Sequence, residues 1–153
     1  MAMTIARTEP AHIIKGFGSS GWGYSRREQD IDSGMFDLGI SAKTSLATAM
    51  QKAQAGNIGT DVSLPMLWAK KHKVEIDTFV IITDNETWAG AVKPFQALKQ
   101  YRDAMGIDAR LAVLGVASTD FTVADPTDKG MMDFVGFDSN APKVLADFSA
   151  GRI

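Results

Sequence analysis

The sequence contains no cysteine, only two histidines and no long apolar run. The absence of cysteine excludes disulfides, thiolate zinc sites and cysteine nucleophiles. Any metal ion must therefore bind oxygen ligands or one of the two histidines. No stretch approaches the roughly 20 apolar residues of a membrane span. Residues 1–10 also lack the apolar core of a signal peptide, so we expect a cytoplasmic protein.

An excess of positive charge is also absent, since 16 basic and 18 acidic residues give a net charge of −2. RNA binding through counterion release needs a positive surface, so this balance disfavours autonomous RNA binding. Arg26, Arg27 and the cluster Lys70, Lys71 and Lys73 are the alternative, although solvated surface groups are the simpler interpretation. No nucleophile elbow, phosphate loop or histidine pair at metal-ligand spacing occurs. We therefore expect a protein that is not an enzyme.

Two nearly continuous apolar runs carry the fold prediction. Asp77–Thr83 and Arg110–Val116 are typical of parallel strands that are covered on both faces. A helical pattern over Lys93–Met105 lies between them. This alternation predicts a three-layer α/β fold, with a mostly parallel sheet and helices on both faces. The length of 153 residues and the 45% hydrophobic content predict one domain over residues 1–153.

Weaker patterns predict the remaining elements. Further strands are expected at Ala11–Phe17, Phe36–Ile40 and Met131–Phe137. Further helices are expected from Thr44 to Gly56, from Thr60 or Asp61 onwards, and from about Asn140 to Gly151. Residues 18–32 are rich in glycine and serine without any period, which predicts a long loop.

A candidate site follows the apolar strand at 77–83. Asp84 comes directly after this strand, and Asn85, Glu86 and Trp88 follow closely enough to line a pocket. Asp61, which is described below, is the fourth residue expected to line it. Because ligands of doubly wound sheets bind beyond the carboxyl ends of the strands, we expect these side chains at the binding edge. An ordinary turn that caps the next helix is the alternative for Asp84 and Asn85.

A second polar pair lies on a glycine-bounded loop. Thr60 and Asp61 follow Gly59 and enter a helix, where unpaired backbone N–H groups favour oxygen ligands. An ordinary helix cap is the alternative for either residue.

Several ordered segments of this sequence resemble one known family. Ile82–Gly90 is similar to the stretch after the fourth strand of the von Willebrand factor A (vWA) domain in Ro autoantigen proteins, the TROVE family. Gly59–Met66 resembles that family's Gly-Thr-Asp loop, and Arg102–Gly106 followed by Leu111–Gly115 resembles its next helix and strand. The resemblance covers nearly the whole chain and is weakest between residues 18 and 40. It implies a vWA-like, Rossmann-like fold.

The resemblance also implies a degenerate metal site. The family's fold opens with a central strand that ends in Asp-x-Ser-x-Ser, the first motif of the metal-ion-dependent adhesion site. No such pentapeptide occurs here, so we expect that the first central strand is missing. By resemblance, Thr60 and Asp84 match the second and third metal motifs. One hydroxyl and one carboxylate should hold Mg²⁺ or Mn²⁺ weakly or not at all.

The partners implied by the resemblance are an RNA-binding ring and a complementing chain. Ro proteins carry a helical-repeat ring that binds RNA, and this chain contains no residue of it. We expect an interaction module that is part of, or partner to, such a TROVE ring and meets RNA only through it. The missing strand predicts self-association or a partner that supplies it, because unpaired buried backbone groups are costly. A free-standing, cation-dependent adhesion domain and a structural remnant are the alternatives.

Overall fold

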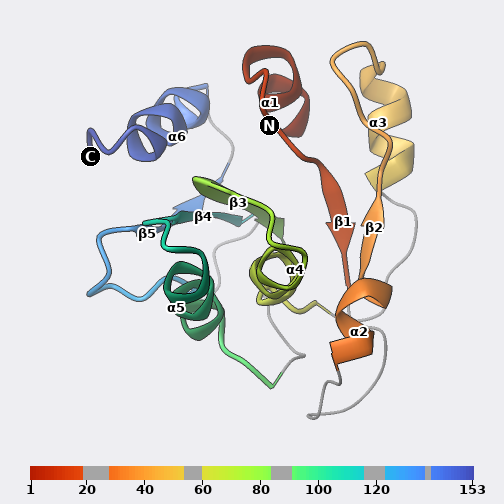
Figure 1. Cartoon of the computed structure of the whole chain (residues 1–153). Helices are drawn as coiled ribbons and strands as arrows, with labels where there is room; N and C mark the ends of the chain where they lie inside the picture. The colour runs from red at the N-terminus through yellow and green to blue at the C-terminus, as the bar shows by residue number, and fades with distance from the viewer. Residues whose placement is uncertain (19–27, 54–59, 84–90, 116–122, 137–138) are drawn as a thin grey trace.

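The computed structural model describes residues 1–18, 28–53, 60–83, 91–115, 123–136 and 139–153. Its central element is a parallel sheet in the order β3-β4-β5, formed by β3 (Thr78–Thr83), β4 (Arg110–Gly115) and β5 (Met131–Val135). A second sheet pairs β1 (Lys15–Phe17) with β2 (Met35–Asp37) in antiparallel orientation. The structure thus confirms the predicted α/β fold with a mostly parallel sheet (Figure 1).

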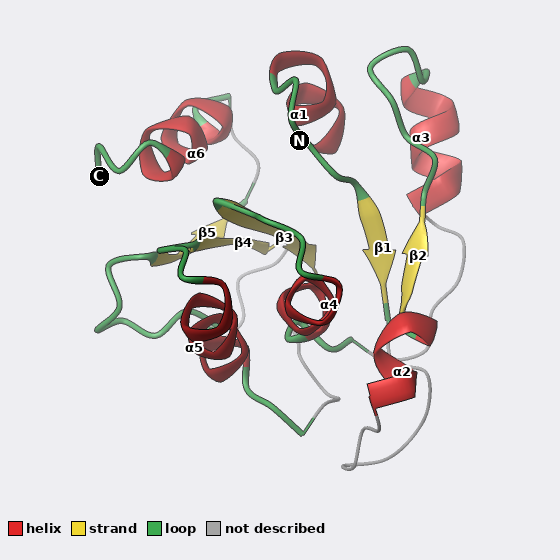
Figure 2. Cartoon of the chain, in the orientation of Figure 1, coloured by secondary structure: helices red, strands yellow, loops and turns green. Residues whose placement is uncertain are grey.

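Helices cover both faces of the parallel sheet. They are α1 (Ala2–Thr8), α2 (Glu28–Ser33), α3 (Leu46–Ala53), α4 (Leu64–His72), α5 (Pro94–Met105) and α6 (Ala141–Ser149). One face is covered by α4 and α5, which contribute Met66 and Leu98 to the larger core cluster. The other face is covered by α6, with α1 beside it, through Phe148 and Ile5 (Figure 2).

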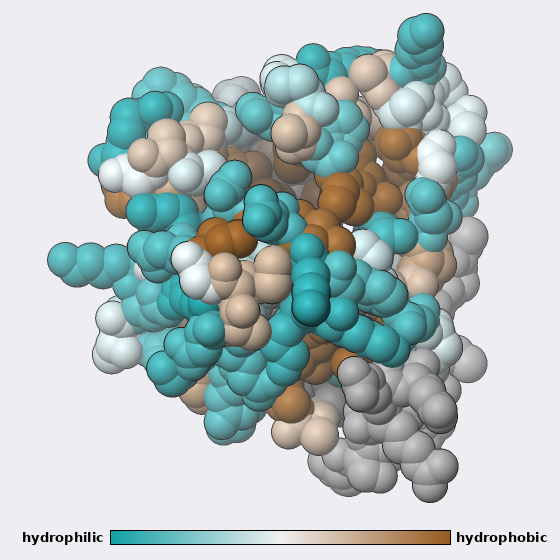
Figure 3. Space-filling view, in the orientation of Figure 1, coloured by the Kyte–Doolittle hydropathy of each residue, from teal (hydrophilic) through white to brown (hydrophobic). Residues whose placement is uncertain are grey.

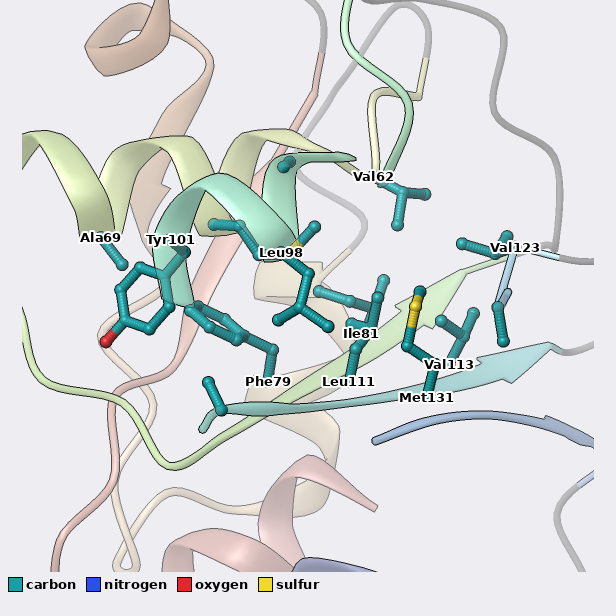
Figure 4. Packing of buried hydrophobic residues seen from close by; sticks show 14 of the residues in the cluster. Val62, Ala69, Phe79, Ile81, Leu98, Tyr101, Leu111, Val113, Val123 and Met131 are labelled. Carbon is teal, nitrogen blue, oxygen red and sulfur yellow. The ribbon is translucent and has the colours of Figure 1, made fainter. Parts of the chain in front are cut away.

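The larger core lies between the sheet and the pair α4 and α5. Phe79 and Ile81 of β3 meet Leu98 and Tyr101 of α5 there, and the rings of Phe79 and Tyr101 pack edge to face with their centroids 5.0 Å apart (Figure 4). The Tyr101 hydroxyl accepts a hydrogen bond from the N–H of Ile76 at 2.7 Å and donates one to the carbonyl of Val74 at 2.8 Å. The segment that leads from α4 into β3 is therefore fixed beneath α5.

The burial of β4 on both faces shows why the two apolar runs in the sequence form strands. All residues from Leu111 to Gly115 are buried, and they alternate between the two faces of the sheet. Leu111 and Val113 join the larger cluster, whereas Ala112 and Leu114 join the smaller one. A strand that is covered on both faces needs an apolar side chain at every position, which is the pattern in the sequence.

Several predicted boundaries in the first part of the chain need correction, and the strand predicted at Phe36–Ile40 is observed at Met35–Asp37. The loop predicted over residues 18–32 is wrong at its carboxyl end, where α2 forms with Ile31 packed against the larger core. The strand predicted at Ala11–Phe17 is confined to its last three residues. At Gly16 this strand meets Phe36 so closely that an added Cβ would lie 2.2 Å from the aromatic ring.

The two sheets are separate. In Figure 2, β1 lies between β2 and β3, and Phe17 at the end of β1 packs against the core that contains Phe79 and Ile81. Nevertheless, β1 pairs only with β2, and β3 pairs only with β4, among the strands that the structure describes. The loss of a central strand between β1 and β3 stays a prediction.

Candidate functional site at the carboxyl edge of the parallel sheet

The entry into α4 is built around the carboxylate of Asp61. Asp61 is 1% exposed, and its Oδ1 accepts hydrogen bonds from the backbone N–H and the hydroxyl of Ser63, the former at 2.9 Å. The N–H of Leu64 donates to the Asp61 carbonyl at 3.2 Å, and α4 begins at Leu64. The helix therefore starts later than predicted, and Asp61 closes the turn that leads into it.

This turn lies at the carboxyl edge of the sheet. Val62 is fully buried in the cluster that contains Ile81 and Val113, the residues near the ends of β3 and β4. Figure 4 shows Val62 and Val123 at the arrowhead end of β3. The turn after Thr60 and the end of β3 at Thr83 are thus on the same side of the molecule.

Asp133 fixes a second segment at this edge, and the sequence analysis did not single it out. Its carboxylate accepts a hydrogen bond from the N–H of Ala124, at 3.2 and 3.1 Å from its two oxygens. Burial raises the pKa of Asp133, although the hydrogen bonds from the N–H groups of Ala124 and Val123 oppose the shift. The signal in the sequence was an aspartate in the middle of an otherwise apolar strand.

Most of the predicted site residues fall outside the described structure. Asp84, Asn85, Glu86 and Trp88 lie in the segment 84–90, which is not described. Thr60 is described and partly buried. In the described part of the chain, no three histidine, aspartate or glutamate side chains form a group that could hold a metal ion. The metal site at Thr60 and Asp84 therefore remains a prediction.

The basic cluster at the end of α4 is tied to neighbouring helices. Lys71 and His72 both contact the carboxylate of Asp32 in α2, at 2.8 and 2.5 Å. Lys70 donates to the side chain of Gln100 in α5 at 2.7 Å. These contacts join α4 to both helices, so Lys70 and Lys71 have a structural role that the sequence analysis did not anticipate. Arg26 and Arg27 lie outside the described residues.

None of the helices described in the structure has the length and apolar character needed to cross a bilayer.

The sheet and the loops at its carboxyl edge define the class of protein to which the molecule belongs. The molecule is an α/β domain with an open parallel sheet, and two of its described segments are fixed at the carboxyl edge by carboxylates, the buried Asp61 and the half-buried Asp133. In this class of fold, that edge is where ligands bind.

Comparison with known proteins gives the family. The model for the Ro60 vWA domain matches residues 1–149. RNA-binding protein RO60 of Deinococcus radiodurans is 41% identical over 154 residues, which cover 100% of this chain and 26% of that protein. RNA-binding protein RO60 of Caenorhabditis elegans is 47% identical over 95 residues, which cover 61% of this chain and 15% of that protein.

A solved structure agrees with these matches. The crystal structure of the Deinococcus radiodurans RO (RSR) protein superposes with a TM-score of 0.84 at 41% identity, over 100% of this chain and 28% of that one. The chain therefore belongs to the Ro60 vWA domain family. It spans about a quarter of the length of the Deinococcus relative.

Proposed function

We propose that this domain is a non-enzymatic interaction module of a cytoplasmic Ro-type ribonucleoprotein, where it acts together with an RNA-binding TROVE ring. The observation that carries the proposal is the match of the whole chain, at 41% identity, to part of a protein named for RNA binding. The domain makes protein contacts, and RNA is bound by the ring.

The charges of this chain support indirect rather than direct contact with RNA. Its net charge is −2, so a global attraction to phosphates is absent. Lys70 and Lys71 of the basic cluster are already engaged with Gln100 and Asp32. Bringing these lysines to an RNA backbone would break contacts that join α4 to α5 and α2.

A domain exchange tests this function. The matching segment of the Deinococcus relative is replaced by this chain, and the affinity for structured RNA is measured by gel shift at several salt concentrations. We expect the chimera to keep the RNA affinity of the relative within about threefold, because the ring is unchanged. This chain alone should bind RNA at least about 100-fold more weakly. Tight, salt-dependent RNA binding by this chain alone would refute the proposal.

A second candidate is a free-standing, cation-dependent protein-binding domain. Its support is the position of the turn after Thr60, which lies at the same edge as the end of β3. In this proposal Thr60 and Asp84 hold Mg²⁺ or Mn²⁺, and Asp61 remains committed to Ser63. So few ligands predict weak binding. Titration calorimetry with Mn²⁺ decides it, since equal heats for the wild type and Asp84→Ala exclude the site.

A further inference from the structure

The end of α4 carries a histidine that joins this helix to α2. His72 Nε2 lies 2.5 Å from Oδ1 of Asp32, and Lys71 Nζ lies 2.8 Å from the other oxygen of the same carboxylate. An ionised carboxylate only accepts hydrogen bonds, so Nε2 of His72 carries a proton and is the donor. Because α2 continues almost directly into β2, this contact helps to attach the β1 and β2 pair to α4.

The ring of His72 also packs against Trp68, one turn earlier in α4. The two ring centroids lie 5.1 Å apart, and Lys15 of β1 lies over the same indole, with its Nζ 4.9 Å from the centroid. A cation within about 6 Å of an indole ring is attracted to it. Trp68 therefore already receives one cation from β1, and it receives a second one from α4 whenever His72 is protonated.

The charges around His72 set the direction of a pH effect. Among the described side chains, Asp32 of α2 favours a positive charge on His72. Three lysines oppose that charge, and they are Lys71 and Lys73 at the end of α4 and Lys15 of β1. Asp32 is the group in hydrogen-bond contact, and Coulomb attraction is largest at the shortest separation. Protonation of His72 therefore strengthens the contact between α4 and α2.

Asp32 stays ionised in the range in which histidine side chains ordinarily change charge. Hydrogen bonds from Lys71 and His72 hold the pKa of Asp32 below its ordinary value, although desolvation opposes the shift. The His72 side chain is 42% exposed, so solvent protons reach it. In the space-filling view, hydrophilic side chains gather over α4 in the middle of the surface (Figure 3). Between about pH 5 and pH 8, the charge of this pair therefore changes at His72 and not at Asp32.

We propose that His72 makes the attachment of α2 to α4 dependent on pH, and that acidification from about pH 8 to about pH 5.5 tightens it. At high pH the neutral imidazole keeps its Nε2 hydrogen bond to Asp32. At lower pH the imidazolium makes this a charge-assisted hydrogen bond, and it also places a cation against Trp68. The β1 and β2 pair, which continues from α2, is then held more firmly. The inference does not rest on the proposed function, since it concerns a contact between two segments of this chain.

Amide hydrogen exchange measures this attachment. The readout is the protection factor of the Asp32 and Ser33 amides at the end of α2, divided by that of Leu111, which reports opening of the parallel sheet. Division by the Leu111 value removes changes in global stability. From about pH 8 to about pH 5.5, this ratio should rise at least about threefold in the wild type, because a charge-assisted hydrogen bond replaces a neutral one.

Three variants locate the effect. His72→Gln keeps a neutral N–H donor and should abolish the rise, and Asp32→Asn should abolish it because the negative partner is removed. His12→Gln is the matched control, since His12 contacts the backbone carbonyl of Glu9 rather than a carboxylate. The rise should therefore be retained in His12→Gln. Circular dichroism of all three variants checks that the fold is retained.

A fourth variant separates His72 from the neighbouring lysine. Lys71 shares the Asp32 carboxylate with His72. Lys71→Met removes this competing cation, so the rise should be at least as large as in the wild type.

Several outcomes would overturn the proposal. The wild-type ratio could fail to rise by the stated factor, or the rise could survive in His72→Gln or in Asp32→Asn. Loss of the rise in His12→Gln, or a smaller rise in Lys71→Met, would equally contradict it. RNA affinity enters none of these measurements, so a failure here is distinct from a failure of the domain-exchange experiment.

Discussion

At the scale of single residues, the carboxylate of Asp133 holds a neighbouring segment in place through a hydrogen bond. Its carboxylate holds the N–H of Ala124 and so fixes the segment that returns to the edge of the sheet after β4. Burial raises its pKa above the ordinary value, because the half-buried carboxylate is poorly solvated in its charged form. The hydrogen-bond acceptor is therefore needed here, whereas the charge is not.

This separation predicts different effects for two substitutions. Asp133→Ala leaves the Ala124 N–H without its acceptor and should lower the free energy of unfolding by about 1–3 kcal/mol. Asp133→Asn keeps an acceptor and removes the charge, so it should stay within about 1 kcal/mol of the wild type. Urea denaturation at pH 7 measures both. Asp103→Ala, at an exposed position of α5, is the control and should change stability by less than about 0.5 kcal/mol. Equal losses for both Asp133 variants would contradict this account.

At the scale of elements, Arg102 connects α5 to the amino ends of two strands. Its Nε donates to the carbonyl of Ala109 at 2.8 Å, next to β4, and its Nη1 contacts Asp128 before β5 at 2.5 Å. Burial disfavours the charge on Asp128, but the hydrogen bonds from Arg102 and from the N–H of Gly130 outweigh it, so its pKa lies below the ordinary value. The ion pair therefore stabilises the end of the sheet opposite the candidate site.

The lowered pKa predicts a pH dependence for this connection. Because the pKa of Asp128 is lower in the folded state, its charged form stabilises the fold. This stabilisation is fully present above the unfolded-state pKa of about 3.9, and it is lost as the pH falls through the folded-state value. Asp128→Asn should lower the free energy of unfolding by about 1–2 kcal/mol at pH 7. The difference from the wild type should shrink below about pH 4. Urea denaturation between pH 2.5 and pH 7, values chosen to bracket roughly this transition, measures it; a constant difference would exclude the ion pair as the cause.

The elements also show which features could be predicted from sequence. The strands β3 and β4 and the helices α5 and α6 were placed nearly correctly, because their apolar patterns are local and continuous. In contrast, α2 was missed. It has little apolar periodicity, and it is held by Ile31 in the core and by the pairing of Asp32 with α4, which are contacts between distant segments.

The candidate site was predicted only in part for the same reason. The turn that contains Asp61 leads into Val62, which packs against Ile81 and Val113 near the ends of β3 and β4, whereas the site itself stays a prediction. The role of Asp133 depends on a contact with Ala124 across two segments, which no local pattern encodes. Ile82 of β3 is 39% exposed, which its place in a continuous apolar run did not predict.

At the scale of the whole molecule, the two sheets differ in how strongly packing stabilises them. The parallel sheet is covered on both faces, and Leu111 and Val113 of β4 are fully buried. The pair β1 and β2 has three residues in each strand, none of them fully buried. An isolated two-stranded sheet of this size is marginal, so its stability depends on the packing of Phe17 and on α2. We therefore expect it to open before the rest of the molecule.

Native-state hydrogen exchange under increasing urea measures this order. The amides of Gly16 and Phe36 should exchange through partial opening, with a free energy at least about 2 kcal/mol below that of Leu111 and Val113. Gly16→Ala forces a methyl group toward the Phe36 ring and should lower the opening free energy of the pair by a further ~1 kcal/mol or more. The exchange of Leu111 should change much less. If all four amides exchange with one common free energy, the two sheets unfold as one cooperative unit.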